Sequence, residues 1–170
     1  MKTAVLGKKK IRIIGDYDVD GICSAHILRF GLETLGANVN AVIPHRIKDG
    51  YGLNDALILQ AKEEKVELVI TCDNGIAARN EIAYAKSMGM TVIVTDHHEV
   101  PYVEADDERT YLIPEADAVI DPKREDCAYP FKGLCGAAVA YKFIESLVEA
   151  MGEESSDIDY LLENVAIATV

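Results

Sequence analysis

The stretch 11–24, IRIIGDYDVDGICS, carries acidic side chains spaced for metal chemistry. Asp16, Asp18 and Asp20 occupy alternate positions directly after an apolar run. Like charges this close raise one another's pKa, and they remain ionised together when a cation neutralises them. The same aspartates are also typical of a cap for the helix that follows. An EF-hand loop is incomplete, because Ile27 stands where the twelfth-position Glu would be.

Two further groups of polar side chains follow predicted strands. Asp73 comes after ELVITC, and Asp96, His97 and His98 end the stretch MTVIVTDHH. Ligands of an open parallel sheet collect beyond the carboxyl ends of its strands, so we expect these side chains to meet the first three aspartates at one edge. Taken singly, DNG is typical of a turn and HH of a polar loop. Their joint placement at three strand ends favours a shared site.

Carboxylates with a histidine are a donor set that suits Mn²⁺ or Mg²⁺. A single carboxylate such as Asp73 is a natural bridge between two ions. Two ions roughly 3.5–4 Å apart would activate a water and steady the attacking and leaving oxygens of a phosphoryl displacement. The spacing therefore predicts a dinuclear centre for phosphate chemistry.

Short apolar runs alternate with longer amphipathic segments. This pattern predicts an α/β fold, a mostly parallel sheet with helices on both faces in a Rossmann-like three-layer arrangement. Asn54 is a predicted N-cap, and Gly89 a predicted helix end. The acidic stretch 101–117 holds two prolines and is expected to be an irregular excursion. The predicted strands are 11–15, 39–44, 67–72, 90–96 and 118–121, and the predicted helices are 22–36, 54–65, 79–89, 136–152 and 157–168.

Composition narrows the class of protein. The 170 residues are 49% hydrophobic, which suits one globular domain with a sizeable core. A formal charge of −12 argues against a protein that binds nucleic acid over its whole surface. The four cysteines form no CxxC pair, so neither a zinc ribbon nor a small disulfide scaffold is indicated. No signal-like segment or run of about 18 apolar residues occurs, so we expect a cytoplasmic protein with no membrane association.

Four stretches together resemble the catalytic DHH domain of the RecJ family of single-stranded-DNA exonucleases: GDYDVDGICS, TCDNGI, VTDHHEVP and VIDPKREDCAYPFKGLCGAAVAYKF. The first three occur throughout the DHH phosphoesterase superfamily and imply the chemistry. The fourth, residues 118–143, resembles the RecJ family more narrowly. The resemblance implies metal-dependent hydrolysis of single-stranded DNA from its 5′ end, with release of 5′ mononucleotides, in repair and recombination.

The resemblance also implies roles for individual residues. Asp18, Asp20, Asp73 and His97 would hold two Mn²⁺ or Mg²⁺ ions. Asp16 would lie near the metals, Asp96 would orient His97, and His98 would contact the scissile phosphate. The candidate phosphate contacts are Arg46, Lys123, Arg124 and Lys132, although each is individually more typical of a solvated surface.

The family supplies a further metal-binding aspartate from a fourth motif, just after a stretch like VAIATV. Here that stretch ends at Val170. We therefore expect residues 1–170 to be a DHH catalytic domain truncated before that motif, without the DHH-associated and oligonucleotide-binding domains. The basic strand-binding surface would lie largely in those domains.

Two alternatives stay open. One is a phosphodiesterase of the same superfamily for short oligoribonucleotides or cyclic dinucleotides. The other is a non-catalytic DHH scaffold or inactive fragment that binds no divalent metal. The expected partner is single-stranded DNA, and a monomer is favoured, although the sequence alone sets neither the oligomeric state nor the cleavage polarity.

Overall fold

The computed structural model describes residues 1–45, 52–106 and 108–170. Within these residues a five-stranded sheet forms the centre of the molecule, in the order β2-β1-β3-β4-β7. Each neighbouring pair is parallel. The strands are β1 (Lys10–Ile14), β2 (Asn38–Val42), β3 (Leu68–Cys72), β4 (Thr91–Thr95) and β7 (Ala118–Ile120). The predicted α/β class is confirmed.

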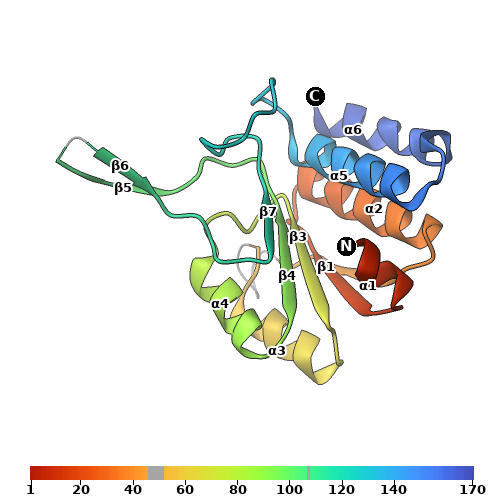
Figure 1. Cartoon of the computed structure of the whole chain (residues 1–170), viewed down its shortest axis with the longest axis horizontal. Coiled ribbons are helices and arrows are strands. Elements are labelled where there is room, and N and C mark those ends of the chain that lie inside the picture. Colours follow the sequence, from red (N-terminus) through yellow and green to blue (C-terminus); the bar gives the residue numbers. More distant parts are fainter. Residues whose placement is uncertain (46–51, 107) are drawn as a thin grey trace.

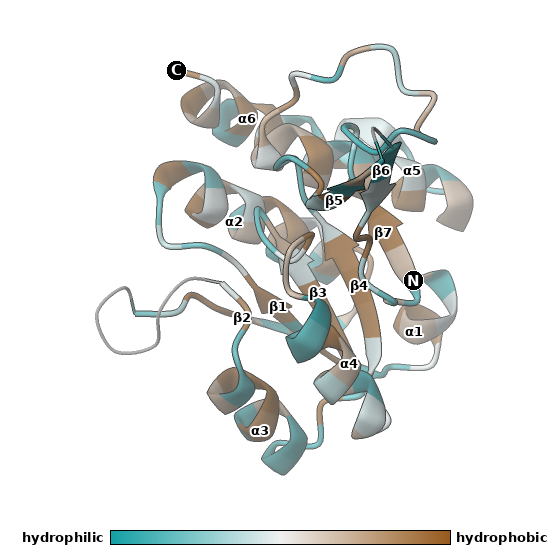
Figure 2. Ribbon diagram, turned by 90° about the vertical axis from the view of Figure 1, so that its left-hand side faces the viewer, coloured by the Kyte–Doolittle hydropathy of each residue, from teal (hydrophilic) through white to brown (hydrophobic). Residues whose placement is uncertain are grey.

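Helices cover both faces of this sheet (Figures 1 and 2). One layer holds α1 (Lys2–Leu6), α2 (Val19–Thr34), α5 (Gly136–Met151), the 3₁₀ helix η1 (Ser155–Leu161) and α6 (Leu162–Ala168). The other holds α3 (Asp55–Glu63) and α4 (Arg79–Ser87). No helix of the described chain is long and apolar enough to cross a membrane.

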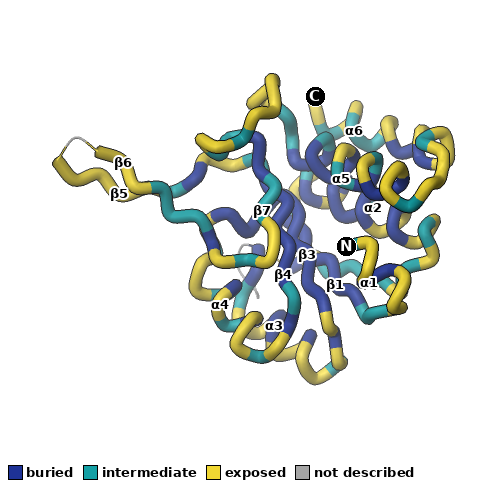
Figure 3. Tube along the Cα trace, viewed as in Figure 1, coloured by how far each residue is buried: buried dark blue, intermediate teal, exposed yellow. Residues whose placement is uncertain are grey.

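Alternation along the strands divides the interior into two cores. Ile11 and Ile13 face the layer of α2 and α5, whereas Ile14, Val92 and Val94 face α3 and α4. Figure 3 shows β3 buried along its whole length and β1 and β4 buried after their first residue. Burial on both faces explains why these strands read as continuous apolar runs in the sequence.

The strand order reverses between β1 and β3. The chain leaves β1 through α2 to reach β2 on one side, while β3, β4 and β7 follow on the other. A crevice opens at such a switch point, beyond the carboxyl ends of the strands. The ends of β1, β3 and β4 are therefore the expected place for a ligand.

The stretch 101–117 is more regular than predicted. It contains an antiparallel hairpin of β5 (Tyr102–Ala105) and β6 (Glu108–Tyr111), which projects from the body (Figure 1). Its residues are almost all exposed (Figure 3). Because neither face packs on a core, the apolar alternation that normally indicates a strand is missing.

Helix ends follow local capping chemistry. The side chain of Asn54 accepts the N–H of Leu57 at 3.0 Å, which confirms the predicted N-cap. Gly89 follows the C-cap residue of α4, Met88, and has a φ of 83°, the left-handed conformation that glycine adopts at a helix end. Helix α2 begins at Val19, three residues earlier than predicted, because Asp18 caps it.

Candidate metal centre

The end of β1 places two aspartates differently. Asp16 is buried, whereas Asp18 is exposed and accepts the N–H of Gly21 at 2.9 Å. A Cβ on Gly21 would lie 2.5 Å from the backbone oxygen of Asp16, so only glycine lets the helix start this close to the strand. Asp18 therefore caps α2, as the helix-cap interpretation of this stretch predicts. It also lies in the acidic cluster.

The end of β3 turns Asp73 into the crevice. Asp73 has a left-handed φ of 59°, and its N–H donates to the carbonyl of Thr95 at 3.1 Å. The buried amide of Asn74 donates to the carbonyls of Ile14 and Cys72, at 3.1 and 2.8 Å. These bonds tie the turn to the ends of three strands and fix the direction of the Asp73 carboxylate.

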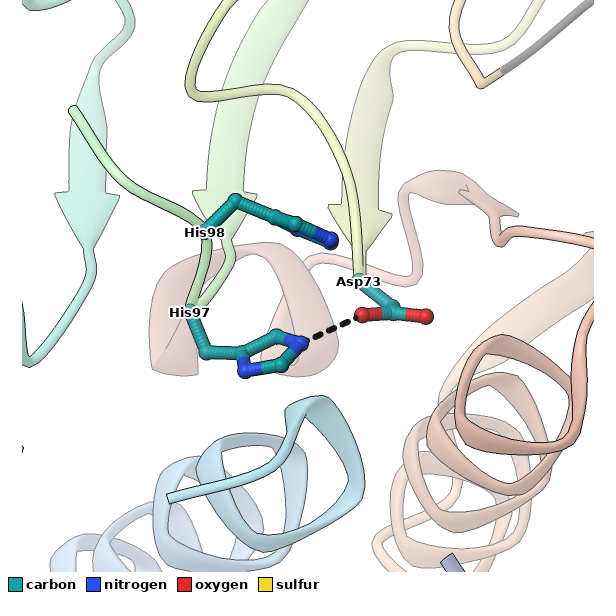
Figure 4. Close-up of side chains that lie close together, drawn as sticks. All are labelled: Asp73, His97 and His98. Carbon is teal, nitrogen blue, oxygen red and sulfur yellow. Dashed lines mark hydrogen bonds and ion pairs between the residues drawn. The ribbon is translucent and has the colours of Figure 1, made fainter. Parts of the chain in front are cut away.

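The first histidine after β4 meets that carboxylate. His97 Nε2 lies 2.9 Å from Asp73 Oδ1 (Figure 4) and 3.4 Å from Asp20 Oδ2. Burial raises the pKa of Asp73 to about 6, with the charges of Asp20 and Asp18 adding to the effect. The hydrogen bond with Asp73 raises the pKa of His97. Carboxylates that repel one another next to an imidazole are what a divalent cation would neutralise.

Asp96 organises the loop that carries both histidines. Its Oδ1 accepts the N–H of His97 at 2.7 Å and lies 2.7 Å from His98 Nδ1, and its Oδ2 accepts the N–H of Ile76 at 2.9 Å. Burial opposes ionisation of Asp96, but the bonds from His98 and Ile76 prevail and lower its pKa. The hydrogen bond between Asp96 and the ring of His98 raises the pKa of His98 to about 9. Asp96 thus orients the ring of His98. Its contact with His97 is a hydrogen bond from the backbone N–H of that residue, and not the contact with the His97 ring that we expected from the sequence.

The donor atoms form two groups that share one residue. Side-chain ligand atoms of Asp16, Asp18 and Asp73 lie within 4.8 Å of one another, and so do those of Asp73, His97 and His98. Oxygen donors with imidazole nitrogen fit Mn²⁺ or Mg²⁺. The predicted ligands Asp18, Asp73 and His97 are therefore brought together, with Asp16 among them.

Asp20, also a predicted ligand, has a second task. Its two oxygens accept the N–H groups of Gly136 and Ala137, each at 2.7 Å. Asp20 therefore caps α5, and the positive end of that helix dipole lies beside the acidic cluster. A Cβ on Gly136 would lie 2.9 Å from Asp73 Oδ1 and 3.0 Å from Ser24 Oγ, so the approach requires glycine.

Asp121 is a residue of this edge that the sequence reasoning missed. It follows β7 and is 2% exposed, next to Asp96, whose N–H donates to the carbonyl of Ile120 at 3.0 Å. Its Oδ1 accepts the N–H of Lys123 at 2.8 Å, and its Oδ2 has no hydrogen-bond partner in the described chain. Burial raises the pKa of Asp121 to about 6. Like the other aspartates, Asp121 lies at the end of a predicted strand, in the sequence VID (119–121). This position was the sequence signal that could have identified it.

The predicted phosphate contacts differ in their surroundings. Lys123 Nζ lies 2.9 Å from Glu99 Oε1. Arg124 donates to the two carboxylate oxygens of Asp126, at 2.9 and 2.6 Å, and to the carbonyl of Val119 at 2.5 Å. Lys132 donates to the carbonyl of Cys127 at 2.6 Å. Arg46 lies outside the described residues.

Comparison with known families matches residues 10–169 to the model of the DHH family, N-terminal domain. This chain belongs to the DHH family. The match covers all strands of the parallel sheet and every predicted site residue. The DHH domain is also similar to solved structures: a manganese-bound exonuclease RecJ, with a TM-score of 0.76 and 33% identity over 91% of this chain and 37% of the other, and RecJ of Thermus thermophilus with Mn²⁺, with a TM-score of 0.73 and 28% identity over 99% of this chain and 22% of the other.

Curated relatives show the same similarity to RecJ. The DHH domain is 40% identical over 170 residues to the single-stranded-DNA-specific exonuclease RecJ of Bacillus subtilis, covering all of this chain and 20% of the relative. It is 33% identical over 171 residues to RecJ of Escherichia coli, covering 95% of this chain and 28% of the relative. The chain thus spans less than a third of the length of either relative. The resemblance to RecJ predicted from the four sequence stretches is confirmed.

Proposed function

We propose that this DHH domain is the metal-dependent catalytic core of an exonuclease that degrades single-stranded DNA from 5′ to 3′, releases 5′ mononucleotides, and serves DNA repair and recombination in the cytoplasm. The observation that carries the proposal is the pair of ligand groups that share Asp73. The RecJ relatives, named as single-stranded-DNA-specific exonucleases, support the substrate.

Asp18, Asp20, Asp73 and His97 would hold Mn²⁺ or Mg²⁺, with Asp16 beside them and Asp73 shared by the two ligand groups. When bound there, two such ions would activate a water for in-line attack on phosphorus and neutralise the charge of the phosphate. The turn at Asn74 holds the Asp73 carboxylate in place for this task.

His98 would bind the scissile phosphate and stabilise the negative charge that develops on it. Asp96 supports this role, since its Oδ1 lies 2.7 Å from His98 Nδ1 and sets the direction of the ring. Asp96 also accepts the N–H groups of His97 and Ile76, so one carboxylate positions both histidines.

Lys123 is the better supported of the candidate phosphate contacts near β7. Its partner Glu99 is 86% exposed, so the ammonium is available for exchange. The donors of Arg124 are committed to Asp126 and Val119, which favours a structural role in the loop after β7.

A nuclease assay tests the proposal. The chain would be incubated with Mn²⁺ and 5′-labelled single-stranded DNA, next to the variants Asp73→Asn and Asp117→Asn, the latter a matched carboxylate change at the opposite end of β7. We expect labelled mononucleotides from the unmodified chain and Asp117→Asn, and none from Asp73→Asn. Cleavage confined to two- to five-mers would contradict the proposed substrate, and product from Asp73→Asn would contradict the proposed site.

A further inference from the structure

Lys123 is held at the edge of the metal centre by two contacts. Its backbone N–H donates to Asp121 Oδ1 at 2.8 Å, which fixes the chain directly after β7. Its ammonium lies 2.9 Å from Glu99 Oε1, and Glu99 directly follows His98 in the chain. The ammonium of Lys123 also acts electrostatically on His98 and Asp121. A cation is therefore placed beside the predicted phosphate-binding histidine.

The two partners of this ion pair differ in burial. The side chain of Lys123 is 28% exposed, whereas that of Glu99 is 86% exposed. The lysine is thus packed against the protein, and the glutamate reaches it from solvent. An ion pair whose carboxylate is this exposed contributes little free energy, so separation of Glu99 from Lys123 is easy.

The contact between Glu99 and Lys123 has the chemistry of a phosphate-binding site. A carboxylate oxygen at 2.9 Å from an ammonium has the charge and distance of a non-bridging phosphate oxygen in a charge-assisted hydrogen bond. Around it the edge is dominated by carboxylates, which repel a nucleic-acid backbone. A strand that approaches the metal centre would gain from the lysine only after the glutamate has left it.

Building on the proposed function, we propose that Glu99 occupies, on Lys123, the position of a backbone phosphate of the substrate strand and is displaced by it. Lys123 is then a substrate-binding residue whose contribution is held back by a competing internal anion. Glu99 sets the affinity for the strand without touching the reacting atoms. Glu99 also discriminates against weakly charged ligands, because only a group with at least the negative charge of a carboxylate, such as a phosphate, can replace it on the Lys123 ammonium.

A double-mutant cycle tests the proposal. Binding of a 3′-labelled, 5′-phosphorylated single strand with hydrolysis-resistant phosphorothioate linkages would be measured by fluorescence anisotropy in Mn²⁺, for the unmodified chain, Glu99→Gln, Lys123→Gln and the double variant. We expect Glu99→Gln to tighten binding about threefold when Lys123 is present, the scale of an exposed ion pair. In the Lys123→Gln background the same change should leave the Kd nearly unchanged.

The matched control is Asp117→Asn, which frees Lys86 from an exposed ion pair of 3.3 Å at the opposite end of β7 and should leave the Kd unchanged. Three results would overturn the proposal: equal tightening in both Lys123 backgrounds, no tightening by Glu99→Gln, or no binding by any variant. Mn²⁺-dependent hydrolysis by the unmodified chain is measured separately. It distinguishes failure of this inference from failure of the proposed function.

Discussion

Asp20 and Gly136 lie 116 positions apart in the chain, and Asp20 Oδ2 accepts the backbone N–H of Gly136 at 2.7 Å. The other oxygen accepts the N–H of Ala137 at the same distance. The first acidic stretch and the fourth RecJ-like stretch, residues 118–143, are therefore joined at the metal centre. The positive end of the α5 dipole also lowers the cost of crowding carboxylates there.

Asp20→Asn tests this link in the absence of metal. The variant keeps one acceptor but turns an amide donor toward a backbone N–H of α5, so one helix-capping bond is lost. We expect the free energy of unfolding to fall by about 1–2 kcal/mol, as for loss of an N-cap. Urea denaturation in EDTA measures this, with the exposed Glu153→Gln as the control. An unchanged midpoint for Asp20→Asn would contradict the expectation that the lost capping bond outweighs the carboxylate repulsion that the variant relieves.

Gly136→Ala should disturb the metal centre directly. The added Cβ would lie 2.9 Å from Asp73 Oδ1, so the carboxylate must shift. We expect Mn²⁺ affinity, measured by calorimetry, to fall at least about tenfold, with a loss of stability of about 1–3 kcal/mol. Gly89→Ala is the control, because it strains a φ of 83° but meets no atom within 4 Å. Equal Mn²⁺ affinity of the two variants would contradict this prediction.

Asp96→Asn should separate metal binding from catalysis. The amide oxygen can still accept the N–H groups of His97 and His98, but the amide nitrogen replaces the oxygen that accepts the N–H of Ile76, and the charged partner of His98 is gone. We expect hydrolysis to slow by about 10²-fold, the scale of a catalytic proton or charge contact, while Mn²⁺ affinity stays within about threefold. Parallel calorimetry and nuclease assays measure the two effects. A loss of metal affinity as large as the loss of rate would contradict a role for Asp96 through His98.

Asp121→Asn should change how the metal-free stability depends on pH. A raised folded-state pKa means that protonated Asp121 stabilises the fold. This contribution is complete below the unfolded pKa of about 4 and is lost as pH rises through the folded pKa of about 6. At pH 7.5 the Asn variant should therefore be more stable than the parent, by on the order of 1–3 kcal/mol.

Urea denaturation in EDTA at pH 4.5 and 7.5 measures this difference. The advantage of the Asn variant should be present at the higher pH and much smaller at the lower one. A difference between the two proteins that is the same at both pH values would contradict the pKa assigned to Asp121.

The parallel sheet could be predicted because its strands are buried on both faces. Runs such as IRII and LVITC carry that burial in their composition, and their ends carried Asp16 and Asp73 with them. The β5–β6 hairpin could not be predicted in this way. With no core behind it, the hairpin leaves no apolar period in the sequence.

The partners of single side chains were harder to predict. Spacing placed Asp96 beside both histidines but could not choose between their rings, since that choice depends on how the loop turns after β4. The capping of α5 by Asp20 is likewise a long-range contact that no local pattern indicates. Asp121 was within reach of the strand-end rule, because it follows β7 as Asp96 follows β4.

The central claim is that carboxylates from the ends of β1 and β3 and histidines from the end of β4 form a divalent-metal centre around Asp73. Titration of Mn²⁺ by calorimetry into the unmodified chain, Asp73→Asn and the control Asp117→Asn tests it most directly. We predict saturable binding by the unmodified chain and by Asp117→Asn, and its loss in Asp73→Asn, which belongs to both ligand groups. Absence of binding by the unmodified chain, or undiminished binding by Asp73→Asn, would contradict the claim.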